Sequence, residues 1–328
     1  MRARAPIRWA IVLVAVALIV VTGGTAVGEL PLVAGGRGPD GISTAQTLNA
    51  TLTNRPAALI ASSNDYPDAL AALPAAALRG GPLLLVTHSA IPPSTAAELT
   101  HVRPATIAVL GGTQAVDDSV VHALRGYTSG PVTRVGGRDH NTTTAAISAA
   151  TFGPGVTAVY IASDRSFADV LVAGAAAARA RVPLLLIARD GIAPSTEREL
   201  TRLRPASIVI VGGIFGVSEK LAHLLAAYTT GSVTREAGAD EYDTAVAVSR
   251  ASFPTTASTV YVATGDTSSV SLADAVAAGL TAGPLLLVHG TCVPRNVTAE
   301  ITRLNPTSVV VLGEEHTTSG AAVSLHPC

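Results

Sequence analysis

Three aspartates stand where loops are expected to become helices, and their carboxylates are the first candidates for binding chemistry. Asp68 and Asp169 occupy equivalent places, and Asp274 takes the corresponding place further along the chain. A carboxylate at the start of a helix accepts hydrogen bonds from backbone N–H groups and complements the positive end of the helix dipole. It can equally accept a hydrogen bond from a sugar hydroxyl. Helix capping is the simpler interpretation, and ligand binding is the alternative.

Short polar loops precede these aspartates at the ends of expected strands. Open parallel α/β sheets bind ligands at the carboxyl ends of their strands, so we expect these loops to be exposed and to form a contact surface. The candidates there are Ser62, Asn64, Ser163 and Arg165. Arg37 and Arg138 follow a glycine at another strand end, where a guanidinium fork can grip a phosphate or a carboxylate. For both arginines a solvated surface position is the alternative.

Catalytic and metal chemistry have few candidates in the sequence. None of the eight histidines has zinc-ligand spacing to a second histidine, a cysteine or a carboxylate. The Gly-Gly pairs at 111–112 and 212–213 lack the pattern of a dinucleotide-binding loop. We therefore predict no catalytic residue, no metal and no cofactor. A site assembled by the fold from distant residues stays open, because catalytic groups need not be close in sequence.

The overall composition excludes two classes of protein. The 328 residues are 48% hydrophobic, 3% aromatic and 14% charged, with 22 basic against 23 acidic residues. So apolar a chain is not intrinsically disordered, and its core must consist of Ala, Val, Leu and Ile. A net charge of −1 does not fit a basic groove that follows phosphates, so no nucleic-acid partner is expected.

Residues 1–28 have the pattern of an export signal. Three arginines precede an uncharged apolar run, and the small residues Ala26 and Gly28 then stand at the two positions that a signal peptidase reads. We predict a secreted chain located at the cell wall or cell surface. If the leader is not cleaved, its apolar run is long enough to serve as an N-terminal anchor, and only then is the membrane a partner.

Cys292 and Cys328 would lie in an oxidising compartment if the chain is exported. A full final helix would carry Cys328 to the edge of the sheet opposite Cys292. The C-terminal residues, however, are small and include Gly320 and Pro327, so the tail can be short and turn back. We predict a disulfide, which would stabilise the fold by about 2 to 4 kcal/mol.

The body of the chain repeats one unit three times. The triplet Pro-Leu-Leu begins at Pro82, Pro183 and Pro284, which are 101 residues apart. The predicted modules are residues 29–131, 132–232 and 233–328, and the third is degenerate. Each is long enough to form a domain core of its own rather than one turn of a solenoid.

Within the second unit, short β-branched runs alternate with longer Ala- and Leu-rich stretches of helical length. Strands are expected at 132–136, 158–162, 184–187 and 207–211, and helices at 143–151, 167–179, 196–203 and 218–228. Thr196 with Glu199, and Thr95 with Glu98, predict capping boxes. The pattern predicts an α/β fold made of three tandem Rossmann-like or flavodoxin-like doubly wound modules, with mainly parallel sheets packed together.

The repeated residues resemble those of the cell-wall-binding repeat type 2 family. The matching positions in the second unit are Gly137, Asp139, Thr143, Ser163, Phe167, Ala168, Asp169, Pro183 to Leu186, and Val211 to Gly213. The resemblance implies three Rossmann-like modules packed in a triangle. It also implies non-covalent attachment to an anionic wall polysaccharide or teichoic-type polymer.

The chain departs from the family pattern at one place in every unit. Family members usually have an arginine after the aspartate of the first motif, and this chain has Gly41, His140 and Glu241 there. An arginine contact to polymer would therefore be missing. We predict a non-catalytic wall-binding protein. A wall-metabolism hydrolase with an unrecognised site and a surface-layer-like assembly protein are the alternatives.

Overall fold

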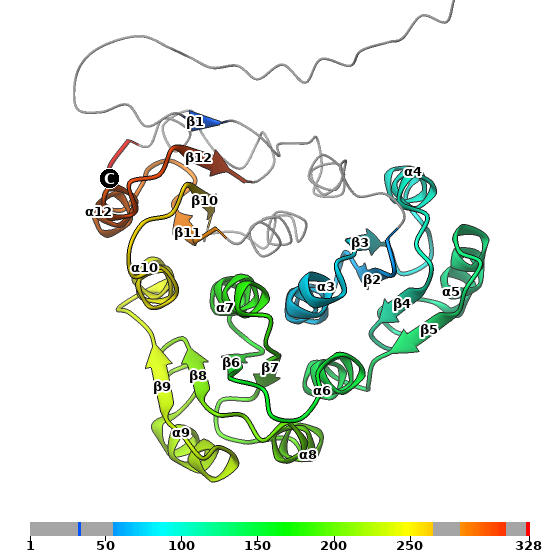
Figure 1. Ribbon diagram of the computed structural model, residues 1–328, viewed down its shortest axis with the longest axis horizontal. Coiled ribbons are helices and arrows are strands. Elements are labelled where there is room, and N and C mark those ends of the chain that lie inside the picture. The colour runs from blue at the N-terminus through cyan, green and yellow to red at the C-terminus, as the bar shows by residue number, and fades with distance from the viewer. Residues whose placement is uncertain (1–31, 34–54, 265–282, 313–325) are drawn as a thin grey trace, which may run out of the picture.

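The computed structural model describes residues 32–33, 55–264, 283–312 and 326–328, which form three four-stranded parallel sheets (Figure 1). The first sheet has the strand order β3-β2-β4-β5, and the second has the equivalent order β7-β6-β8-β9. The third has the order β1-β12-β10-β11, which is the same order viewed from the other edge. The predicted α/β fold of three parallel-sheet modules is confirmed. The leader, Arg37 and Asp274 lie outside the described residues.

The strands are short and mostly buried. Their bounds are β1 Leu32–Val33, β2 Ala58–Ser62, β3 Leu83–Val86, β4 Ile107–Leu110, β5 Val132–Val135, β6 Val159–Ser163, β7 Leu184–Ile187, β8 Ile208–Val211, β9 Val233–Glu236, β10 Thr259–Thr264, β11 Leu285–Val288 and β12 Ser308–Val311. In β2, β3, β6 and β7 every residue is buried, as expected for parallel strands that are covered on both faces.

The three repeated prolines have equivalent environments. Pro82, Pro183 and Pro284 are all buried immediately before β3, β7 and β11. Each proline carbonyl accepts a 2.9 Å hydrogen bond from the second or third residue of the neighbouring strand, namely from the N–H groups of Leu59, Tyr160 and Tyr261. The prediction that they open equivalent buried strands is therefore confirmed.

The strand expected to open the second unit belongs to the preceding sheet. β5 pairs with β4 of the first sheet through Ile107 and Val132, and β9 pairs with β8 in the same way. β1, from the first unit, pairs with β12 of the third sheet. We expected this strand in the second sheet, and that prediction was wrong. β5 is half-exposed, which suits the edge of a sheet, and it pairs with β4 at the edge of the first sheet. The sheets are thus offset by one strand from the repeats, and the chain closes into a ring.

Helices from the first two modules meet at the centre of this ring (Figure 1). They are α3 (Leu73–Arg79) and α7 (Phe167–Ala180), and α2 (Tyr66–Ala71) also packs on α7. One buried apolar cluster joins side chains of all three modules. Alanines and one glycine allow the helices to approach closely, since a Cβ on Gly174 would lie 2.8 Å from the carbonyl oxygen of Leu70.

The remaining helices link and cover the sheets. They are α4 Pro93–Val102, α5 Asp118–Leu124, α6 His140–Thr151, α8 Pro194–Leu203, α9 Glu219–Leu225, α10 Glu241–Ser252 and α12 Arg295–Leu304, with 3₁₀ turns at Arg125–Tyr127 and Ala226–Tyr228. α6 and α10 follow the edge strands β5 and β9 and pack on the next module. Over the described ranges, no helix has both the length and the apolar character needed to cross a bilayer.

The predicted capping boxes are absent from α4 and α8. α8 begins at Pro194, and its N-cap residue, Ala193, has no side-chain cap. Thr196 and Glu199 therefore lie within the helix, and both are buried. The Thr95 hydroxyl of α4 donates a 2.6 Å hydrogen bond to the Leu85 carbonyl instead of capping its helix. The prediction was wrong because proline at the first helical position starts each helix two residues earlier than expected.

The predicted disulfide between Cys292 and Cys328 is confirmed, with a Cα–Cα distance of 5.1 Å. The C-terminal residues run beside the segment that leads into α12. There, Val293 donates a hydrogen bond to the His326 carbonyl, and Cys328 donates one to the Val293 carbonyl. Cys328 therefore lies beside Cys292, as expected for a short tail that turns back.

Candidate functional site

The helices are seen end-on in Figure 1, so they run in a similar direction and the molecule has two ends at which helices begin or finish. In a parallel α/β module each helix runs opposite to the strands, so helix N-termini lie at the carboxyl ends of the strands. We call this end the strand-end face. The opposite end, where the helices finish, is the helix-end face. Those predicted ligand contacts that the structure describes belong to the strand-end face.

Asp68 and Asp169 are not helix caps, contrary to the simpler interpretation of the sequence. The N-cap residue of α2 is Asp65, and that of α7 is Ser166, whose side chain accepts a hydrogen bond from the Asp169 N–H. The two aspartates stand one turn later, at the third helical position. They still lie near the positive end of the helix dipole.

Both aspartates point toward a glycine at the end of a neighbouring strand. A Cβ on Gly111 would lie 3.0 Å from Oδ2 of Asp68, and one on Gly212 would lie 2.3 Å from Oδ2 of Asp169. These glycines have φ values of 87° and 102°. The repeated Gly-Gly pairs thus give room to the carboxylates and turn the chain, which explains the motif without a bound nucleotide.

The arginines of the repeated Val-Thr-Arg triplet support these glycine turns. Arg134 donates to the carbonyls of Gly111, Gly112 and Val116 at 2.8 to 3.1 Å. Arg235 makes the equivalent bonds to Gly212 and Val217. Their guanidinium groups thus donate several hydrogen bonds to the protein's own backbone. The sequence analysis did not predict this role.

A histidine from the second module completes the surroundings of Asp68. Nδ1 of His140, the first residue of α6, lies 3.1 Å from Oδ1 of Asp68 and 3.4 Å from Oδ1 of Asp65. Burial raises the pKa of both carboxyls. The hydrogen bond with Asp68 raises the pKa of His140. Sequence reasoning missed this contact because 72 residues separate the two partners.

The junction between the second and third modules has different residues at the same places. Ser166, Asp169 and Glu241 stand where the first junction has Asp65, Asp68 and His140. Burial raises the pKa of Asp169, and the charge of Glu241 raises it further. This junction therefore brings two carboxylates together without an imidazole.

The predicted loop candidates are partly buried. Ser62 and Ser163 are only 3% and 2% exposed, and each hydroxyl accepts a hydrogen bond from the N–H two residues later. The expectation that they are exposed was wrong, because they are the last residues of buried strands and shape the turns that follow. Asn64, Arg138 and Arg165 are exposed. Phe215, which the sequence analysis did not single out, is 87% exposed on the loop after Gly213.

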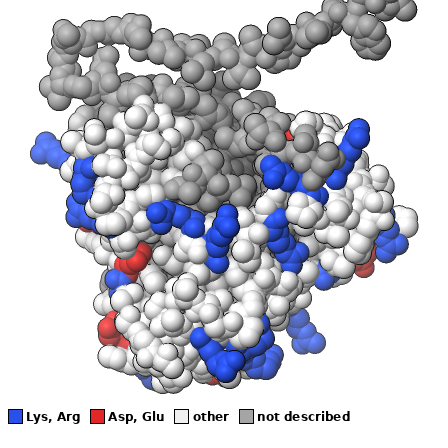
Figure 2. All heavy atoms as spheres, in the orientation of Figure 1, with Lys and Arg blue, Asp and Glu red and all other residues white. Residues whose placement is uncertain are grey.

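The helix-end face is rich in arginine. Arginines stand in the last turn of several helices or at their C-caps. They are Arg79, Arg103, Arg179, Arg181, Arg202, Arg204, Arg250 and Arg303. A positive charge there complements the helix dipole. Figure 2 looks along the helices at one face, where Lys and Arg side chains gather and Asp and Glu are sparse, as expected for the helix-end face.

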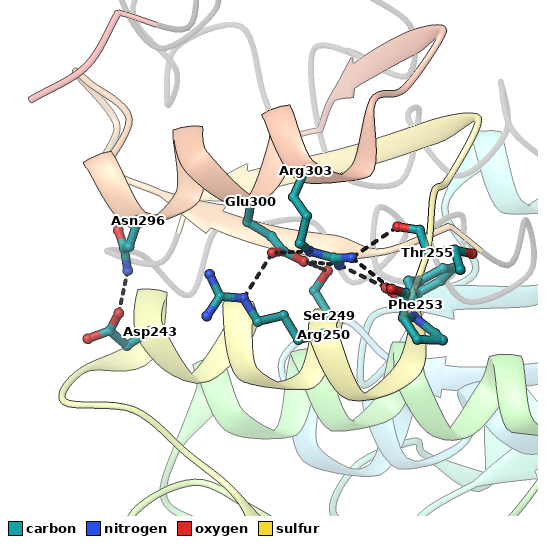
Figure 3. A network of polar contacts seen from close by, with 9 residues as sticks. Asp243, Ser249, Arg250, Phe253, Thr255, Asn296, Glu300 and Arg303 are labelled. Atoms are coloured by element: carbon teal, nitrogen blue, oxygen red, sulfur yellow. Dashed lines mark hydrogen bonds and ion pairs between the residues drawn. The ribbon is translucent and has the colours of Figure 1, made fainter.

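Buried glutamates hold some of these arginines in place (Figure 3). Glu300 is fully buried, and its carboxylate accepts hydrogen bonds from Ser249, Arg250 and Arg303 at 2.6 to 3.1 Å. Arg303 also donates to the Phe253 carbonyl. Burial alone would raise the pKa of Glu300, but the hydrogen bonds outweigh it and hold the pKa below its usual value.

The same arrangement recurs in the second module. Glu199 accepts hydrogen bonds from Ser148 and Arg202, and Arg202 donates to the Phe152 carbonyl. In the first module His101 replaces the arginine at the matching place. Oε1 of Glu98 has no hydrogen-bond partner among the described residues, and burial raises the pKa of this carboxyl.

Two arginines of the helix-end face contact a residue of the neighbouring module. Arg79 of α3 donates a 2.7 Å hydrogen bond to the Ala150 carbonyl of α6. The guanidinium carbon of Arg179, in α7, lies 4.2 Å from the centre of the Phe253 ring, a cation–π contact. A small hollow opens beside each arginine. The helix-end face therefore presents positive charge where the second module meets the first and where it meets the third.

Comparison with known proteins agrees with this architecture. The family model "Cell wall binding domain 2 (CWB2)" matches residues 37–121, 134–222 and 235–323. Cwp6 from Clostridium difficile superposes with a TM-score of 0.80 at 23% identity, over 94% of this chain and 51% of that one. Cwp8 from the same organism has a TM-score of 0.78 at 22% identity, over 88% of this chain and 50% of that one.

A curated relative has a similar extent of match. The N-acetylmuramoyl-L-alanine amidase LytC of Bacillus subtilis is 25% identical over 256 residues, which is 78% of this chain and 50% of the amidase. The chain thus spans about half the length of each of these three proteins. The three segments matched by the family model make up most of the sequence, and the chain belongs to the cell wall binding domain 2 family.

Proposed function

We propose that this chain is an exported, non-catalytic protein that attaches non-covalently to an anionic polymer of the cell wall. Membership of the cell wall binding domain 2 family, with three tandem matches, supports wall binding. Export and a location at the cell wall or surface are further parts of the proposal. They rest on the pattern of residues 1–28 and on the family.

The observation that carries the proposal is the row of arginines on the helix-end face. Arg103, Arg181 and Arg204 are exposed C-cap residues with left-handed backbone, and no side-chain partner is found for them among the described residues. Guanidinium groups bind phosphate and carboxylate in a bidentate manner. A polymer with repeated anionic groups could therefore contact several modules at once.

The strand-end face suits a polyanion less well. Its exposed arginines include Arg138 and Arg165, which are adjacent to Asp139 and Asp164 just before α6 and α7. Arg189 is also exposed there and pairs with Asp190. Like charges of polymer and protein would repel each other there. We therefore assign the anionic groups of the polymer to the helix-end face. Asn64, Arg138 and Arg165 remain secondary candidates for contacts to sugar hydroxyls.

Two other functions give different results in simple assays. The relative LytC is named as an amidase, and half of its length lies outside the similarity. Clear lysis in a zymogram of purified walls would support a wall hydrolase and contradict the non-catalytic proposal. Large, defined assemblies in light scattering, without any wall binding, would support a surface-layer-like assembly protein.

The direct test is sedimentation of the purified chain with cell walls before and after removal of their anionic polymers. We expect the chain to sediment with intact walls and to stay in solution with stripped walls. Equal sedimentation with both would contradict the proposal, since the ligand would then be the peptidoglycan itself. Peptidoglycan-free polymer added as a competitor should release the bound chain.

A further inference from the structure

One group of side chains on the strand-end face has metal-ligand chemistry. The ligand atoms of Asp65, Asp68 and His140 all lie within 4.8 Å of one another. Asp65 and Asp68 belong to the start of α2 in the first module, whereas His140 opens α6, which packs on the second sheet. We propose that this junction binds one Zn²⁺ ion, with these three side chains as its protein ligands.

The distances suit such an ion. Zinc binds imidazole nitrogen and carboxylate oxygen at about 2.0 to 2.2 Å, so two ligand atoms of a tetrahedral site lie roughly 3.4 Å apart. Nδ1 of His140 is 3.4 Å from Oδ1 of Asp65 and 3.1 Å from Oδ1 of Asp68. Small side-chain rotations are enough to place these atoms around one ion. A fourth position is left for water, because a structural or open zinc site needs four ligands.

The charges also favour a dication. The Asp65 and Asp68 side chains are only 24% and 6% exposed. In the part of the chain that the structure describes, the basic group that contacts both carboxylates is the His140 imidazole, which carries at most a single charge. Asp164 adds a third carboxylate, whose charge acts on both His140 and Tyr66. Oδ1 of Asp164 is buried without a hydrogen-bond partner among the described residues. A bound dication would offset this concentration of negative charge.

The second junction provides an internal comparison. There Ser166, Asp169 and Glu241 replace Asp65, Asp68 and His140. A neutral serine is a poor zinc ligand, and no imidazole is present among these three residues. The inference therefore concerns one site in the molecule. An ion bound there would connect the start of α2 to the start of α6 and so hold the first module to the second.

The test is calorimetric titration of the full chain, without a histidine tag and after treatment with chelator, with ZnCl₂. We expect one Zn²⁺ per chain and a rise in the thermal midpoint, because an ion that binds only the folded state stabilises it. His140→Ala and Asp68→Asn should each weaken binding by at least about tenfold, since each removes a ligand. Asp169→Asn, at the matching place of the second junction, should bind zinc like the unmodified chain.

Three results of the titration would overturn the inference. They are the absence of zinc binding by the unmodified chain, equal binding by His140→Ala, and an equal loss in Asp169→Asn. Circular dichroism without metal shows whether each variant is folded. If His140→Ala is not folded, His140→Gln is used in its place. The unmodified chain offers an independent check, because one equivalent of Zn²⁺ must shift the imidazole NMR signals of His140. Unchanged His140 signals at saturation would also contradict a site with this ligand.

Discussion

Carboxylates on the two faces of the molecule have opposite surroundings. On the strand-end face Asp169 lies beside Glu241 with little positive charge near it, and burial raises its pKa. On the helix-end face Glu300 accepts hydrogen bonds from two arginines, and its pKa is lowered. Both faces follow the rule that acids suit helix N-termini and bases suit helix C-termini. The comparison teaches that the repeated fold separates charge, so that one face favours cations and the other anions.

The largest expected effect comes from Glu300→Gln. The change keeps the shape of the side chain but removes the charge that holds Arg250 and Arg303, and hydrogen bonds to charged groups are worth about 1.5 to 3 kcal/mol each. We expect a loss of about 3 kcal/mol in the free energy of unfolding at pH 7, measured with urea.

The matched variant on the other face is Asp169→Asn. Because the folded state raises the pKa of Asp169, ionisation of this group costs stability, and the amide should be neutral or slightly stabilising at pH 7. For Glu300 the folded pKa is lowered, so its contribution is present above about pH 4.5 and is lost as the pH falls further. Equal losses in the two variants at pH 7 would break the comparison between the faces.

A second, smaller effect on the free energy of unfolding is expected from a change at Glu236, the last residue of β9 on the strand-end face. Burial raises the pKa of this carboxyl from 4.5 to about 7. The folded state therefore binds this proton more tightly than the unfolded state does, and stability falls as the pH rises from about 4.5 to 7. Glu236→Gln should remove this fall and make the protein about 2 kcal/mol more stable at pH 8, with no difference at pH 4.

The measurement is urea unfolding of the unmodified chain and Glu236→Gln between pH 4 and pH 8. Glu219→Gln is the control, since the Glu219 side chain is 64% exposed and pairs with Arg235 at the surface. A stability difference between Glu236→Gln and the unmodified chain that does not change with pH would show that burial of the charge is not the cause.

Much of the fold could be predicted from the 101-residue repeat. The equivalent prolines Pro82, Pro183 and Pro284 indicated three similar modules, and alternating apolar and amphipathic stretches indicated parallel sheets. The disulfide followed from a compartment argument and a short tail. These features depend on local pattern and spacing, which sequence displays directly.

The features that were missed depend on contacts between distant segments. β5 joins the preceding sheet because that sheet has a free edge, and the strand's own residues carry no sign of this choice. Glu199 resembled part of a capping box but bonds to Ser148, 51 residues away. His140 approached Asp68 only through the packing of α6 on the neighbouring module. The sequence analysis also did not predict that the arginines at the helix ends form one surface.

The central claim is that the helix-end face binds the wall polymer. Its most direct test is also the one with the smallest expected change in free energy, here the free energy of binding to the wall. Arg103→Asn with Arg204→Asn removes two exposed charges from the helix-end face. Asparagine fits there, since Asn305 has the same left-handed backbone at the matching place of the third repeat. Arg138→Asn with Arg165→Asn removes two exposed charges from the strand-end face.

Sedimentation with intact walls then compares the two double variants with the unmodified chain at low and physiological salt. At about 0.5 to 0.7 kcal/mol per exposed ionic contact, the helix-end variant should bind roughly five- to tenfold more weakly, with a smaller dependence on salt. The strand-end variant should bind within about twofold of the unmodified chain. A loss confined to the strand-end variant, with unchanged binding by the helix-end variant, would contradict the account.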